Sequence, residues 1–243
     1  MIDQAPPTQI PRASIARLAG ALYLGTIIGG LFAELISRGS LIVRDDAAAT
    51  ATSILANQGL FRAGLVGDLV MLACYVGVTA LFHDMFAPVS RRVSLTAAAF
   101  SMIGIAVLAV DSYFLLATLR LLDAPSYLAT ALDAPQREAL ALLSLKLHGD
   151  GYDLSLVFFG VYCLMLGWLV WRSGFVPRTI GALMALAGIC YLINSLADLA
   201  APAFANTLSP HLMDPTLIGE AALAVWLLVF GSKGGFRGGR LAR

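Results

Sequence analysis

Six acidic side chains lie inside or at the ends of long apolar stretches of this sequence. They are Glu34, Asp68, Asp111, Asp153, Asp198 and Glu220. An ionisable group in an apolar segment is costly, and it usually binds a ligand, moves a proton or pairs with a neighbouring group. Asp68, Asp111 and Glu220 lie deepest in their stretches, so they are the strongest candidates for such chemistry.

Other polar side chains accompany these acids along the chain. His148 and Tyr152 are four residues apart and share one face of a helix, just before a long apolar run. Tyr191 and Asn194 are one turn apart in a later run, and Arg62 precedes the first deep acid by six residues. The candidate ligand-binding residues are therefore Asp68, Asp111, His148, Tyr152, Tyr191, Asn194, Glu220 and Arg62.

The composition indicates a membrane protein. The chain has 243 residues, of which 59% are hydrophobic and 13% charged, and its mean hydropathy is +0.82. That charged fraction is about half of what soluble domains carry. The net charge of +1 and the lack of a basic, aromatic stripe exclude nucleic acid as an expected partner. Membrane lipids are the partners that this composition predicts.

Six apolar stretches approach the length of about 20 residues that a membrane-spanning helix needs. They cover residues 18–36, 63–82, 94–119, 154–171, 179–197 and 215–231, and the last is short. None shows the alternating pattern of a barrel strand. The sequence therefore predicts an all-α, polytopic membrane protein with a bundle of six transmembrane helices.

The basic residues predict how this bundle is oriented. Ten of the 16 lysines and arginines lie on the termini and on the short connections near residues 91 and 175. The positive-inside rule then places both termini in the cytoplasm, in a bacterial inner membrane. Residues 1–13 are expected to be disordered, residues 14–231 to form the membrane domain, and residues 232–243 to form a basic tail.

Two long connections on the opposite, outer side are expected to contain helices that do not cross the membrane. Residues 46–61 are mostly small, and residues 134–148 carry leucines at three- and four-residue steps. The second segment could continue into the next span, but Gly149 and Gly151 favour a bend between them. Both segments are predicted to be amphipathic helices that act as lids.

The distribution of charge along the spans suggests a pocket. All six acids fall in the outer halves of their stretches, while the inner halves have neither acids nor bases. We therefore expect an outward-facing polar pocket that is closed below by an apolar plug. The alternatives are that an acid caps a helix, touches headgroups, or pairs with another helix or with Arg62 or Arg120.

Several kinds of chemistry find no support in the sequence. A three-histidine zinc site is disfavoured because His83 falls on the inner side, whereas His148 and His211 fall on the outer side. The three cysteines lie within apolar runs and have no metal-binding spacing. No nucleophile elbow or phosphate-binding loop is present. We therefore expect neither a metal nor a cofactor.

Four blocks of sequence together resemble one family. They are "RLAGALYLGTIIGGLFAE", "LIVRDDAAATATSILANQGLFRAGLVGDL", "LHGDGYDLSLVFFGVYCLMLGWLVWRSGFVPRTIGALMALAGICYL" and "GEAALAVWLLVFG". The chain resembles, over residues 14–231, the bacterial integral-membrane family catalogued as domain of unknown function 4386. The resemblance implies a six-helix membrane protein and no particular reaction. It draws attention to Asp46, Thr50, Arg62, Asp68, His148 and Glu220; the family pattern has Gly-Asp where this chain has Asp45-Asp46.

Three functional hypotheses follow. The first is a binding or sensing protein that holds a small molecule or a lipid headgroup in the outer pocket. The second is a lipid-modifying enzyme, hydrolase-like, that uses a carboxylate as general base with His148 as its partner, which requires His148 to lie within hydrogen-bond reach of an acid or a nucleophile. The third is a small transporter, which the charge-free inner halves disfavour. The sequence leaves the ligand and the oligomeric state open.

Overall fold

The computed structural model describes residues 12–201 and 213–231, and this part of the chain is helical, with no strand. The elements are α1 (Ala13–Leu31), η1 (Phe32–Arg38), α2 (Gly39–Leu41), α3 (Ala47–Ala56), α4 (Gln58–Phe86), α5 (Arg91–Asp123), α6 (Ser126–Ala131), α7 (Ala134–Ser173), α8 (Arg178–Ala200) and α10 (Asp214–Phe230). The all-α prediction is therefore confirmed. The expected disordered N-terminus and basic tail lie almost wholly outside the described residues, as does His211.

Five helices are long and apolar enough to cross a membrane. They run over Ala13–Leu41, where α1, η1 and α2 are continuous, and over α4, α5, α7 and α8. The sixth predicted span forms α10, which has 17 residues and is shorter than a typical transmembrane helix. The fold is thus that of a polytopic helical membrane protein with five long helices and one short one.

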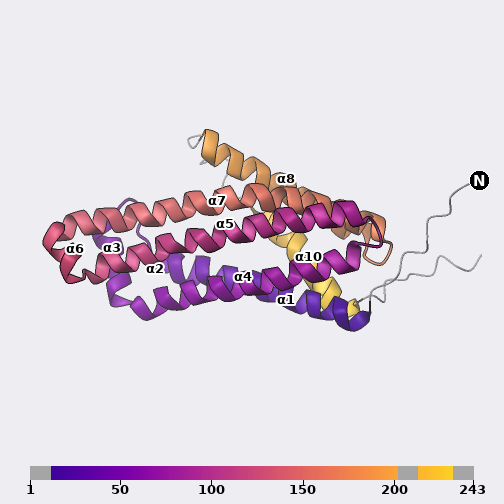
Figure 1. The fold of residues 1–243 in the computed structure, drawn as a ribbon, viewed down its shortest axis with the longest axis horizontal. Helices are drawn as coiled ribbons and strands as arrows, with labels where there is room; N and C mark the ends of the chain where they lie inside the picture. The colour runs from indigo at the N-terminus through magenta and orange to yellow at the C-terminus, as the bar shows by residue number, and fades with distance from the viewer. Residues whose placement is uncertain (1–11, 202–212, 232–243) are drawn as a thin grey trace, which may run out of the picture.

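The main helices form a closed ring. Each packs against the next along the chain, in the order α1, α4, α5, α7, α8 and α10, and α10 returns to pack against α1. Figure 1 shows α3 and α6 at one end of the bundle, which we call the head end. The start of α1 and the end of α10 lie at the opposite end, which we call the terminal end (Figure 1).

Glycines bring α7 and α8 into close contact. A Cβ on Gly167 would lie 2.7 Å from the carbonyl oxygen of Gly181, and a Cβ on Gly188 would lie 2.6 Å from that of Gly160. Because no larger residue fits at these crossings, the two backbones touch over two turns of each helix. This contact fixes the position of the polar side chains farther along α8.

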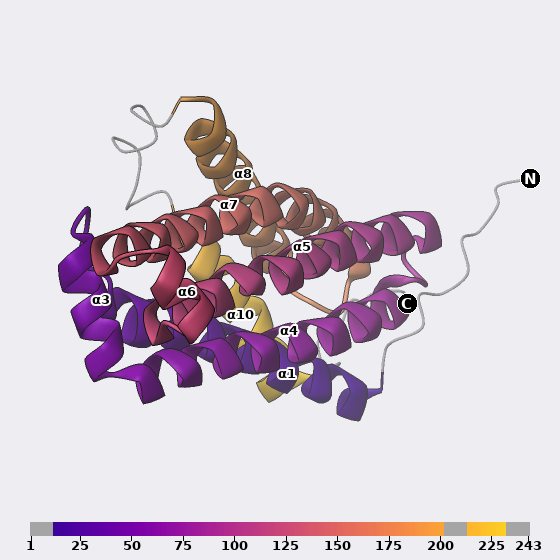
Figure 2. The same ribbon diagram turned by 60° about the vertical axis from the view of Figure 1, so that its left-hand side comes forward.

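Two details of the outer connections differ from the prediction. Residues 134–148 do not form a separate helix, because α7 is continuous over 40 residues, about 60 Å at 1.5 Å per residue. Gly149 and Gly151 therefore do not break the helix. The other lid is shorter than expected, since α3 ends at Ala56 and the residues after Asn57 already belong to α4. Figure 2 shows α3 and α6 packed around the head end.

The buried apolar residues form two cores. The larger core lies toward the terminal end and is built from α1, α4, α5, α7, α8 and α10. The smaller core lies in the head end, where Leu41, Ile54, Phe61, Leu119 and Leu145 meet. The buried side chains between the two cores are polar: Asp68 on α4, Asp111 and Ser112 on α5, and His148 and Ser155 on α7. A polar layer therefore separates the cores, and it contains half of the candidate site residues.

Candidate functional site

The first part of the polar layer is an arginine held by two carboxylates. Nη1 and Nη2 of Arg38 donate to the two carboxylate oxygens of Asp68, at 2.5 and 3.3 Å. Nε of Arg38 donates to Oε2 of Glu34 at 3.0 Å. Arg38 and Asp68 are buried, whereas the Glu34 side chain is exposed. The paired donors of a guanidinium match a carboxylate, so this geometry holds Arg38 in one orientation.

The local structure of η1 positions Arg38. Residues 32–38 form a π-helical segment at the end of α1, a rare element that is enriched at functional sites. Gly64 lets this segment approach α4, because a Cβ there would lie 2.6 Å from Cβ of Ser37. The Ser37 hydroxyl donates to the Leu60 carbonyl at 3.0 Å. These contacts bring Arg38 against Asp68, one turn farther along α4.

The second part of the layer is a pair formed by an aspartate and a histidine. Nδ1 of His148 lies 2.5 Å from Oδ2 of Asp111, and both side chains are buried. Neither atom has a hydrogen bond of regular geometry, so this is a close polar contact. Among the described residues, Nε2 of His148 and Oδ1 of Asp111 have no hydrogen-bond partner. Both atoms are thus available to a further polar group.

Gly151 provides the space for Asp111. A Cβ on Gly151 would lie 2.6 Å from Cγ of Asp111, whereas a Cβ on Gly149 would meet nothing within 4 Å. Of the two glycines that predicted a bend, one is therefore required for the approach of α5 to α7. This explains why α7 stays straight through a sequence with two glycines.

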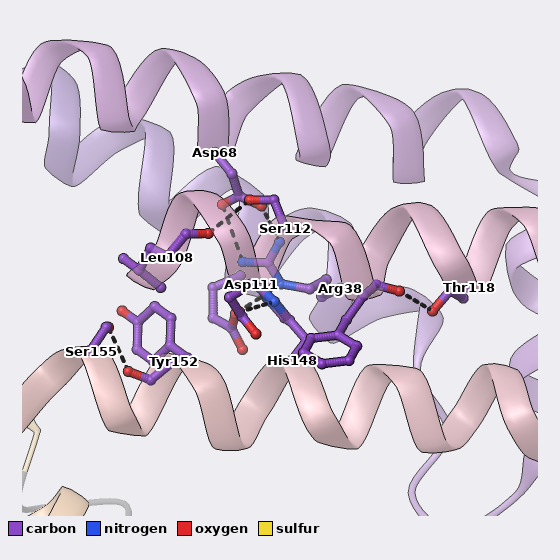
Figure 3. A network of polar contacts seen from close by, with 11 residues as sticks. Arg38, Asp68, Leu108, Asp111, Ser112, Thr118, His148, Tyr152 and Ser155 are labelled. Atoms are coloured by element: carbon purple, nitrogen blue, oxygen red, sulfur yellow. Dashed lines mark hydrogen bonds and ion pairs between the residues drawn. The ribbon is translucent and has the colours of Figure 1, made fainter. Parts of the chain in front are cut away.

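The two charged pairs lie side by side. Figure 3 shows Arg38 and Asp68 next to Asp111 and His148, with Tyr152 directed from α7 toward the same space. The residue is 37% exposed, so the protein does not fully cover this part of the layer.

Glu220 belongs to a second cluster. The Tyr191 hydroxyl donates to Oε1 of Glu220 at 3.1 Å, and Sγ of Cys163 lies 3.9 Å from the same oxygen. A third cluster lies nearer the end of α8, where Nδ2 of Asn194 donates to Asp153 at 3.4 Å and to Asp198 at 3.2 Å. Apart from Arg62, the candidate residues thus come from five helices and fall into three adjoining clusters, and their role in binding stays a prediction.

Arg62 lies outside this layer. Its Nη2 donates to Asp123 at 3.1 Å, and both side chains are largely exposed. The alternative that Arg62 pairs with Asp68 is therefore wrong, because Arg38 takes that place. Arg38 is absent from the candidate residues that the sequence predicted. Its spacing of four residues from Glu34 was the signal that could have identified it.

Residues Asp46 and Thr50, which the family resemblance emphasised, shape the connection before α3. Oδ1 of Asp46 caps α3 by accepting from the Ala49 amide at 2.8 Å. The Thr50 hydroxyl bonds both the amide and the carbonyl of Val43, each at 3.0 Å. Asp45 has a φ of 58°, which explains the glycine of the family pattern at this position.

A surface ion pair joins this connection to α7. Nζ of Lys146 donates to Oδ1 of Asp45 at 2.7 Å. This hydrogen bond is the main reason why the pKa of Asp45 is lowered from its usual value. Within the described ranges, no group of three histidine, cysteine or acidic side chains could hold a metal ion.

The fold and the polar layer together define a class: a helical membrane protein with buried charge pairs between two apolar cores. The chain belongs to the family described as domain of unknown function DUF4386, whose model matches residues 18–231. A protein of Archaeoglobus fulgidus, described as uncharacterized, is 25% identical over 169 residues, or 70% of this chain and 84% of that protein. No solved structure matches the chain.

Proposed function

We propose that the polar layer binds a positively charged amine, either a small molecule or the amine of a lipid headgroup. The observation that carries this proposal is the excess of carboxylates. The layer and its adjoining clusters contain six acids, but within the described residues only two bases, Arg38 and His148, contact them. In that part of the chain, Asp153, Asp198 and Glu220 have no lysine or arginine within 4 Å.

The depth of the layer suits a headgroup. The rise from Arg91 to Asp111 along α5 is about 30 Å, the thickness of the hydrocarbon core. If the terminal end lies at one membrane surface, Asp111 lies near the other. A ligand at this level meets the aqueous phase, and the exposed ring of Tyr152 offers it a polar and aromatic contact.

The proposed orientation places the terminal end in the cytoplasm of a bacterial inner membrane. The guanidinium groups of Arg172 and Arg178 lie 5.6 and 5.9 Å above the rings of Trp168 and Trp171 at that end. Both tryptophans are exposed. An interfacial tryptophan belt beside basic residues supports this assignment. The polar layer then faces outward.

Thermal unfolding of the purified protein tests the proposal. Choline and ethanolamine should raise the Tm, while phosphate at equal ionic strength should not, because an acidic site attracts cations and repels anions. Asp198→Asn and Glu220→Gln should weaken the effect. Asp84→Asn, which removes an exposed carboxylate from the other end of α4, is the matched control. If phosphate raised the Tm as much as the amines do, or if the amines still raised the Tm of both variants by the wild-type amount, the site would be ruled out.

A second comparison separates the two sources of the amine. The protein is reconstituted in nanodiscs of phosphatidylglycerol alone or with phosphatidylethanolamine. A lipid ligand predicts that the ethanolamine lipid raises the Tm and abolishes the effect of free ethanolamine. A free small molecule predicts that both nanodiscs respond equally to added ethanolamine.

The Asp111–His148 contact supports one alternative, a lipid-modifying enzyme. A carboxylate next to a histidine whose second nitrogen lacks a protein partner can orient that histidine as a general base. The nearby hydroxyl of Ser112 already donates to the Leu108 carbonyl at 3.0 Å, so water would be the nucleophile. Mass spectrometry of lipids incubated with the protein or with His148→Gln tests this alternative. Identical product profiles would exclude it.

A further inference from the structure

Within the described residues, the inner halves of the predicted spans contain no acid, since Asp84 lies beyond them in the last turn of α4, but they contain buried hydroxyl groups. They belong to Thr79, Ser94, Ser101 and Tyr162, each at most 3% exposed. His83, half-buried in the last turn of α4, accompanies them. The plug expected below the polar layer is therefore not purely apolar. Hydroxyl groups can relay protons without carrying a charge, so the lack of charged groups in this half does not argue against proton movement through it.

Four of these residues form a ladder between α4 and α5. Oγ1 of Thr79 lies 2.7 Å from Oγ of Ser101, and Nδ1 of His83 lies 3.1 Å from Oγ of Ser94. Thr79 and His83 are one turn apart on α4, while Ser94 and Ser101 are two turns apart on α5. The ladder therefore runs along the bundle from the terminal end toward the centre.

A small cavity continues the ladder on the side of α7. It has a volume of about 10 Å³, and Thr79, His83, Ser94 and Tyr162 are among its lining residues. This volume corresponds to about one water molecule. The Tyr162 hydroxyl is buried and has no hydrogen-bond partner among the described residues. A water molecule in this cavity would connect it to the hydroxyls of the ladder.

Tyrosines lead from this cavity to Glu220. The ring centroid of Tyr75 lies 6.3 Å from that of Tyr162 and 6.0 Å from that of Tyr23, and beside Tyr162 the Sγ atom of Cys163 lies 3.9 Å from Oε1 of Glu220. The Tyr23 hydroxyl is also buried without a partner in the described part of the chain. The Tyr23 hydroxyl is thus free to bond the carboxylate, and the Tyr162 hydroxyl is free to bond an intervening water.

We propose that this chain of groups is a proton path between the terminal end and Glu220. A proton enters at His83 and passes over the Ser94 hydroxyl and the water to Tyr162, while the Thr79 hydroxyl, paired with Ser101, holds the water in place. The His83 imidazole and each hydroxyl on the route accept one proton and release one, so only the carboxylate of Glu220 ends with a changed charge. From there, Tyr191 and Tyr152 lead to the polar layer and the opposite surface. The path gives the protein a proton-conducting activity that does not depend on its ligand.

Proton flux into vesicles of phosphatidylethanolamine and phosphatidylglycerol tests the path. A potassium diffusion potential set with valinomycin drives protons inward, and trapped pyranine reports the pH. The wild-type protein should carry a flux well above that of protein-free vesicles. Tyr162→Phe, which removes only the hydroxyl, and Glu220→Gln should each reduce it on the order of tenfold or more, as expected for a broken relay.

The matched control is Thr96→Ala, because Thr96 is an exposed hydroxyl on α5 that bonds the Arg92 carbonyl. Its flux should equal that of the wild type. Thermal unfolding of each variant confirms that it is folded, and Thr79→Val and Ser101→Ala provide further hydroxyl deletions if one variant is not. A wild-type flux equal to that of empty vesicles, or variants that conduct normally, would overturn the proposal. Amine binding is measured separately, so either proposal can fail alone.

Discussion

Gly151 and Gly149 provide a sharp test of the packing around Asp111, because they lie two residues apart in the same helix. Alanine in place of a helical glycine stabilises the fold by roughly 0.5–1 kcal/mol when its methyl group has room. Gly149 has that room, and Gly151 does not. Gly149→Ala should therefore leave the stability unchanged or slightly higher.

Gly151→Ala should act in the opposite direction. Its methyl group would overlap the carboxylate of Asp111 and force it away from His148. Leaving two buried polar groups without their partner costs about 1–3 kcal/mol each, so after the helical gain the net loss is roughly 2–4 kcal/mol. For a chain of this length, this loss corresponds to a decrease in Tm of about 5–15 °C.

A thiol-reactive dye measures the unfolding directly, because the three native cysteines, Cys74, Cys163 and Cys190, are all unpaired and lie within the long helices. The decisive control is the Asp111→Ala background, in which the methyl group of Gly151→Ala has space. There the substitution should cost nothing. If Gly151→Ala and Gly149→Ala have the same Tm, or if the loss persists without the Asp111 carboxylate, the account of this contact is wrong.

Two further predictions concern ion pairs. Arg38→Ala should lower the free energy of unfolding by about 3–5 kcal/mol, because it leaves Asp68 buried without its cation. Arg62→Ala, which removes an exposed pair, should change it by less than about 1 kcal/mol in the same unfolding assay. Lys146→Ala should raise the pKa of Asp45 toward its usual value, measured by carboxyl ¹³C NMR titration. Because the pKa of Asp45 is lowered in the folded protein, the contact with Lys146 stabilises the connection at neutral pH, and this stabilisation is lost as the pH falls through that pKa. If Asp45 titrated identically in Lys146→Ala and in the wild type, this account of the contact would be wrong.

Local signals in the sequence predicted the helices well. The apolar stretches identified all five long helices to within a few residues in most cases. Asp133 and Gln136, three residues apart, form a capping box at the start of α7. Gly174, in the left-handed conformation, ends the same helix. These features depend on a few neighbouring residues, so the sequence shows them directly.

The partners of the buried charges could not be predicted in the same way. Asp68 has basic residues before it at both 38 and 62, and only the approach of η1 to α4 selects Arg38. Asp111 could have paired with Arg120 along its own helix, yet the crossing of α5 and α7 presents His148 instead. Pairing across helices depends on how the helices rotate and cross, which no local pattern records.

The hydroxyl ladder was missed for a related reason. A serine or threonine in a helix usually bonds the carbonyl one turn before it, and Thr79 does bond the Tyr75 carbonyl at 2.8 Å. From the sequence, the hydroxyl of such a residue is therefore expected to bond within its own helix and to have no partner on another helix. The second contact, from Thr79 to Ser101, arises only because two helices pack with these faces together.

The sequence by itself determined that the chain is helical, that it belongs in a membrane and that its acids gather toward one end. Hydrophobic length and charge placement decide those properties, because each helix meets the bilayer separately. The tertiary structure decided that α7 runs unbroken past Gly151, that Arg38 joins the polar layer and that α10 closes the ring. These outcomes depend on close contacts between distant segments, where the absence of one methyl group determines which side chains meet.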